Sequence, residues 1–261
     1  MFLVLDSLKF YKLKSENTAR GLFVIVYLFF LGFSVFTIGK PINIDALVEA
    51  IQKNDITAYP HITSANIVFY ASILVFSILI SFFSLAYATC LVMETDGFPG
   101  KKGIIAAIRQ LPKLIGFVLI LIIPIIVSGL FLFIPIIYIY YSMFFAPMLM
   151  TEGKKSIIDA MKESFRVSKG FKISIFFNQM MIYFILNIPI TLFASGFLYS
   201  GYNNTMAEYL VMSFISAAQV LITGRLMGNF YILVVKNEGR LKSIIEEKTD
   251  EDNQDETDNQ E

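Results

Sequence analysis

The sequence has few of the residues that usually carry chemistry. Its 261 residues include one cysteine, Cys90, and one histidine, His61. A single cysteine excludes an intramolecular disulfide and a cysteine-based zinc or iron–sulfur site, and a single histidine excludes His-pair metal motifs and most histidine-assisted catalysis. The sequence also has no phosphate-binding loop, no nucleophile elbow and no pair of carboxylates within an apolar segment. We therefore expect no metal, no cofactor and no enzymatic activity.

Charge is scarce as well, because only 16% of the residues are charged whereas 56% are hydrophobic. A soluble domain is usually about 25% charged and about 45–50% apolar. This composition nearly excludes a soluble single-domain enzyme. It indicates an integral membrane protein, for which we expect the lipid bilayer as the main partner and no nucleic acid.

Long uncharged stretches predict the membrane spans, since a helix needs about 20 apolar residues to cross a bilayer. One stretch between Lys113 and Glu152 has 38 uncharged residues, which is too long for one straight span at about 1.5 Å per residue. Gly129 and Pro135 predict a turn within it. The six predicted spans lie near residues 21–39, 66–93, 113–130, 132–150, 173–200 and 209–235.

The basic residues predict the orientation of these spans. Of the 21 lysines and arginines, 18 lie before the first span or after an even-numbered span. Six spans with both termini in the cytoplasm put all 18 inside, as the positive-inside bias requires. We therefore predict an all-α multi-pass protein of a bacterial plasma membrane. Its parts are a cytoplasmic amphipathic segment (1–20), a transmembrane domain (21–245) and a disordered tail (246–261) with nine acidic residues.

Two cytoplasmic segments resemble each other. Residues 100–110 read GKKGIIAAIRQ and residues 153–163 read GKKSIIDAMKE, with a shorter echo at 242–246. Each follows an even-numbered span, so we predict three repeated helical hairpins that end in interfacial amphipathic helices. Ser156 and Asp159 have the spacing of a capping box. The lysines either contact anionic lipid headgroups or only follow the positive-inside bias; the candidate lipid contacts are Lys101, Lys102, Lys154 and Lys155.

Arg225 is the one charged residue inside the sixth predicted span. A charge at this depth is costly and usually faces a bundle interior. We expect no acidic residue at the same depth, so polar side chains of the fifth and sixth spans, water or a ligand anion would hold the guanidinium. The candidate polar site comprises Arg225, Asn229, Gln219, Asn178, Gln179 and Asn187. The alternative is that the span ends near Gly224 and Arg225 snorkels to the headgroups.

Residues 144–171, FFAPMLMTEGKKSIIDAMKESFRVSKGF, contain a short recognisable pattern. The segment resembles a broad group of bacterial six-span membrane proteins. That group includes the membrane domain attached to some glycerophosphodiester phosphodiesterases and uncharacterised families such as the YciC-like proteins. The resemblance implies a six-span fold and no catalytic residue. The matching positions are Ala146, Pro147, Glu152, Gly153, Ala160, Ser164, Lys169 and Gly170.

Two functions are compatible with these patterns. The first is a non-enzymatic accessory, assembly or immunity-type factor that acts through lipid or protein contacts, which the lack of catalytic residues favours. The alternative is a transporter or the permease subunit of an ABC-type exporter, with an ATPase subunit as its partner. Six spans permit the second function, and Arg225 could then line a path through the membrane.

Overall fold

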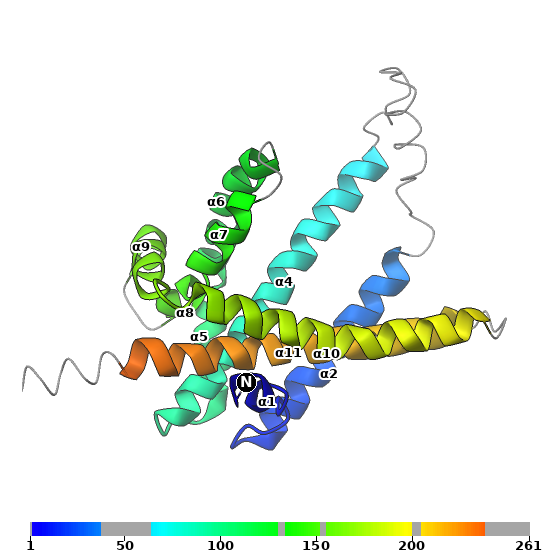
Figure 1. Ribbon diagram of the computed structural model, residues 1–261, viewed down its shortest axis with the longest axis horizontal. Helices are drawn as coiled ribbons and strands as arrows, with labels where there is room; N and C mark the ends of the chain where they lie inside the picture. The colour runs from blue at the N-terminus through cyan, green and yellow to red at the C-terminus, as the bar shows by residue number, and fades with distance from the viewer. Residues whose placement is uncertain (1, 38–63, 130–133, 152–154, 200–204, 238–261) are drawn as a thin grey trace, which may run out of the picture.

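The computed structural model describes residues 2–37, 64–129, 134–151, 155–199 and 205–237, and this part of the chain is helical without any strand (Figure 1). The predicted tail 246–261 and the echo at 242–246 lie outside the described residues. The helices are α1 (Phe2–Ser7), α2 (Glu16–Thr37), α4 (Ser64–Thr95), α5 (Gly100–Arg109), α6 (Leu111–Gly129), α7 (Ile134–Ser142), α8 (Ala146–Thr151), α9 (Ile157–Val167), α10 (Lys172–Tyr199) and α11 (Thr205–Tyr231), which a π-helical turn (Ile232–Lys236) extends.

Three helical segments are long and apolar enough to cross a membrane: Glu16–Ser34, Leu74–Thr95 and Tyr209–Lys236. Two more candidates arise if each bent pair of helices is one span, namely α5 with α6 at 55° and α9 with α10 at 93°. The described residues thus hold three to five candidate spans, whereas the sequence predicts six. These helices are consistent with a membrane protein.

The helix that we predicted over 132–150 is divided in the structure. α7 ends at Ser142 and α8 begins at Ala146. Side chains of α9 stabilise the break, because Ser164 Oγ donates to Ser142 O at 2.8 Å and accepts from Phe145 N at 3.1 Å. The prediction of one continuous helix here was wrong.

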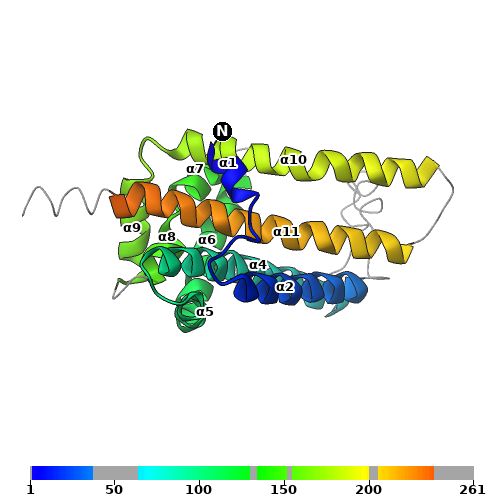
Figure 2. The same ribbon diagram turned by 90° about the horizontal axis from the view of Figure 1, so that it is seen from below.

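α11 lies at the centre of the fold, between α10 on one side and α2 and α4 on the other (Figure 2). It approaches α4 closely because small residues line the contact. A Cβ on Gly224 would lie 2.5 Å from Ser84 O, and one on Gly228 would lie 3.3 Å from Ala88 O. Gly224 and Gly228 have the GxxxG spacing that allows two apolar helices to pack at short distance.

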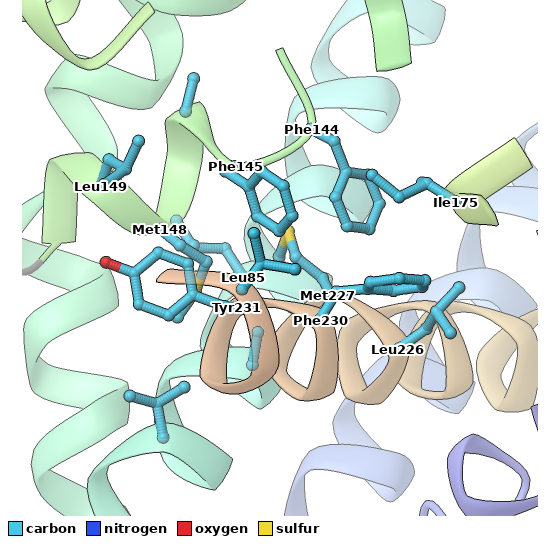
Figure 3. Packing of buried hydrophobic residues seen from close by; sticks show 14 of the residues in the cluster. Leu85, Phe144, Phe145, Met148, Leu149, Ile175, Leu226, Met227, Phe230 and Tyr231 are labelled. Atoms are coloured by element: carbon cyan, nitrogen blue, oxygen red, sulfur yellow. The ribbon is translucent and has the colours of Figure 1, made fainter. Parts of the chain in front are cut away.

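The core forms where α11 meets the break after α7. Met227, Phe230 and Tyr231 of α11 face Phe144 and Phe145 in the break (Figure 3). Phe145 and Tyr231 are completely buried. The core therefore joins α4 to the α6–α7 pair near one end of each. These helices diverge from one another at their far ends (Figure 1).

Candidate functional site

Arg225 is buried, with 7% of its surface exposed, and its side chain contacts the N-terminal segment. Its Nε donates to Asp6 O at 2.8 Å, and its Nη1 donates to Lys12 O at 2.7 Å. Its Nη2 lies 3.2 Å from Asp6 Oδ2. Asn229, one turn later, donates to the same Asp6 oxygen at 2.9 Å. All three guanidinium nitrogens of Arg225 and the side-chain amide of Asn229 therefore contact residues 6–12 near the N-terminus.

This arrangement corrects two predictions from the sequence. We expected no acidic partner for Arg225, yet Asp6 provides one because α1 folds back against α11 in both views (Figures 1 and 2). We also expected the amides of α10 to hold the guanidinium. Instead, Asn178 donates to Ser174 O at 2.7 Å and Asn187 donates to Tyr183 O at 2.9 Å, within their own helix.

The remaining members of the predicted polar site do not join the cluster. Gln179 and Gln219 are half-buried. Among the described residues, neither contributes a hydrogen bond to Arg225 or Asp6. Of the two interpretations of Arg225, the structure supports burial against protein rather than snorkelling. Only Arg225 and Asn229 of the six predicted residues come together.

Tyr87 of α4 extends the cluster, and the sequence analysis missed it. Its hydroxyl donates to Phe10 O and lies 3.4 Å from Arg225 Nη1. The side chain is fully buried. Donors from α4 and α11 thus satisfy three backbone carbonyls of the N-terminal segment, those of Asp6, Phe10 and Lys12.

Glu94, at the end of α4, is the second residue that the sequence analysis missed. It is 5% exposed, and its carboxylate accepts from Lys14 N at 2.7 Å and from Ser15 N at 3.1 Å. Lys14 Nζ returns a bond to Glu94 O at 3.0 Å. We call residues 6–15 the N-terminal strap. Arg225 and Tyr87 bind its carbonyls at residues 6, 10 and 12, and Glu94 binds its amides at residues 14 and 15.

The chemistry of this site is structural in character. Buried backbone donors and acceptors need partners, and the strap receives them from charged side chains on two apolar helices. Within the described ranges, no group of three or more His, Cys, Asp or Glu side chains is placed to hold a metal ion. Lone Cys90 is buried in the packed core.

The candidate lipid contacts fall into two groups. Lys101 and Lys102 of α5 are exposed, and Lys102 Nζ lies 4.8 Å from the centroid of the Phe98 ring. Lys155 forms an ion pair with Glu163, while Lys154 lies outside the described residues. Comparisons of the chain with protein-family models, curated proteins and solved structures find no match, so the function is inferred from this chemistry alone.

Proposed function

We propose that the protein is a non-enzymatic, multi-pass protein of the bacterial plasma membrane. It crosses the bilayer six times with both termini in the cytoplasm. It acts as an accessory, assembly or immunity-type factor through contacts with lipids or other proteins. The three to five candidate spans among the described residues support this proposal in its coarser form.

The observation that carries the proposal is the engagement of the charged groups inside the apolar helices. An intramembrane charge that binds a substrate or relays a proton needs an open side toward a cavity or water. Arg225 has all three nitrogens directed at strap acceptors, and both carboxylate oxygens of Glu94 accept strap amides. These contacts favour a structural task for both residues.

A second observation concerns the outward face of α10. Ile173, Phe177, Met181, Phe184 and Ile188 recur at helical spacing, and each is at least 41% exposed. A contiguous apolar face of this kind marks a surface for lipid or for another protein. It supports a function through contacts, and it places no reactive group on that surface.

The topology can be tested with cysteine labelling in a Cys90→Ala background, using a thiol reagent that does not cross membranes. Lys53→Cys and Asn203→Cys should react in intact cells, whereas Lys102→Cys and Ser156→Cys should react only after the cells are opened. Labelling of either of the last two in intact cells would refute the six-span arrangement.

The exporter alternative is tested by purification in a mild detergent. An accessory or immunity-type factor should purify without an ATPase subunit, and adding ATP should produce no hydrolysis above background. An ATPase that co-purifies at a fixed ratio and hydrolyses ATP would replace our proposal with the permease function. No contact of the described residues favours that second function, because Arg225 is already occupied.

A further inference from the structure

The two copies of the internal repeat occupy equivalent positions in the fold. α5 and α9 each precede a bent junction with a long apolar helix. Ala107 and its counterpart Ala160 are completely buried, while Ile105 and its counterpart Ile158 are 51% and 60% exposed. Both helices therefore pack on the protein through small residues and direct an isoleucine outward.

The two copies differ in how their basic residues are paired. In the second copy, Glu163 forms an ion pair with Lys155 and lies 3.7 Å from Arg166. The position of Glu163 corresponds to Gln110 in the first copy, and that of Asp159 corresponds to Ala106. The second copy thus carries its own carboxylates, and the first copy does not.

The acidic residues near α5 are engaged elsewhere. Glu94 accepts the strap amides, and Asp96 forms an ion pair with Lys236. Among the described residues, no carboxylate pairs with the exposed basic side chains of α5. Those side chains are Lys101, Lys102 and Arg109.

A surface groove of about 470 Å³ lies between the end of α4 and α5. We call it the α5 groove, and its lining residues are Met93, Phe98, Lys102, Ile105, Ala106 and Arg109. Lys102 and Arg109 are two helical turns apart, or about 10 Å, and the apolar side chains lie between and beside them. An apolar floor with two unpaired cations complements a lipid that has an acyl chain and a negative headgroup.

We propose that the α5 groove binds an anionic phospholipid of the cytoplasmic leaflet. Its phosphate contacts Lys102 and Arg109, and the upper part of an acyl chain packs against Phe98 and Ile105. This inference rests on the proposed membrane location. The equivalent surface of α9 selects anionic lipid less, because Asp159 and Glu163 offset two of its three basic residues Lys155, Lys162 and Arg166.

Each basic residue near an anionic surface contributes about five-fold to the preference for negative lipid, so two contribute roughly 25-fold. The chain has no tryptophan, so one introduced tryptophan is its only indole fluorophore. We would place it at Ile105 (Ile105→Trp) and, as the matched control, at the equivalent position of the second copy (Ile158→Trp). The full-length variants are reconstituted in vesicles of phosphatidylglycerol and phosphatidylcholine, with bromine on the acyl chains of one lipid at a time to quench nearby fluorescence.

The expected result is selective quenching at the first copy only. Brominated phosphatidylglycerol should quench the Ile105→Trp variant with a preference of up to about 25-fold, and the Ile158→Trp variant should show little preference. Adding Lys102→Gln and Arg109→Gln should abolish the preference. Adding Lys162→Gln and Arg166→Gln, which removes the same charge from exposed positions of α9, should leave it intact.

A second variant tests the role of charge without removing either cation. Ala106→Asp copies the residue of the second repeat and puts a carboxylate four residues after Lys102 and three before Arg109, where it can pair with both. It should also abolish the preference. Equal quenching of Ile105→Trp by the two lipids, or a preference that survives both changes, would overturn the proposal. Quenching by neither lipid would overturn the membrane location as well, which separates the two failures.

Discussion

Replacement of Arg225 by leucine tests the N-terminal strap most directly. Arg225→Leu removes two charge-assisted hydrogen bonds to the carbonyls of Asp6 and Lys12, each worth about 1.5–3 kcal/mol. It also removes the contact with the Asp6 carboxylate, which is worth only about 1 kcal/mol because the Asp6 side chain is 43% exposed. These contributions add to about 4–7 kcal/mol, and we expect a loss in the free energy of unfolding at the lower limit, about 4 kcal/mol, which lies within the range for a broken buried ion pair.

The chain contains its own reporter for this measurement. Cys90 is the only cysteine and is completely buried, so a dye that becomes fluorescent on reaction with thiols follows unfolding in detergent. A loss of about 4 kcal/mol corresponds to a decrease in Tm of roughly 8–16 °C for a chain of this size. Arg225→Lys keeps the charge, but its three donors lie on one nitrogen and cannot reach acceptors that three separate guanidinium nitrogens meet, so its Tm should lie between those of the wild type and Arg225→Leu. Arg109→Leu, at an exposed position of α5, is the matched control and should change stability by less than about 0.5 kcal/mol.

A double-mutant cycle with Asp6→Asn identifies the partner. If Arg225 and Asp6 interact directly, the loss in the double variant should be smaller than the sum of the single losses by about 1 kcal/mol. A wild-type Tm for Arg225→Leu would refute the strap as a stabilising element. Strict additivity would refute the ion pair while leaving the carbonyl contacts possible.

The remaining predictions concern the other end of the strap and the packing of α5. Glu94→Gln keeps one acceptor oxygen but loses the negative charge that faces two strap amides, so we expect a loss of about 1–2 kcal/mol and faster protease cleavage of the strap. Gly103→Ala puts a Cβ 2.5 Å from Cys90 N, so α5 must shift, and we expect a loss of about 1–3 kcal/mol and faster labelling of Cys90. Gly21→Ala, with nothing within 4 Å, should be neutral or stabilise by up to about 1 kcal/mol.

Features that depend on neighbouring residues could be predicted from the sequence. The helical class and its long apolar helices follow from the uncharged stretches, whereas the turn predicted between Gly129 and Pro135 falls on residues 130–133, outside the described residues. The serine half of the predicted capping box is confirmed, because Ser156 Oγ accepts from Asp159 N at 3.2 Å; the Asp159 carboxylate accepts from the Ser156 hydroxyl. The break after Ser142 could not be predicted, because it is stabilised by the hydroxyl of Ser164, which lies 22 residues further along the chain.

Of the charged residues in the polar site, only Arg225 could be recognised from the sequence. Arg225 interrupts an apolar stretch and is therefore conspicuous. Its partner Asp6 lies 219 residues away, in a segment whose charges fit an ordinary cytoplasmic terminus. Glu94 follows a long uncharged stretch. A charged residue at a membrane surface gives the same sequence pattern. No local sequence pattern predicts that Arg225 and Glu94 bind the same strap.

The signs of the two charges follow from the backbone groups that they face. The strap makes a few backbone hydrogen bonds of its own, such as Lys9 N to Asp6 O. Its other carbonyl oxygens and amide hydrogens still need partners where it crosses apolar helices. Arg225 can only donate and meets carbonyls at the start of the strap, whereas Glu94, as a carboxylate, accepts from the amides at its end. Each charge therefore matches the backbone groups that it faces, carbonyls for Arg225 and amides for Glu94, and two neutral apolar residues could not satisfy either set.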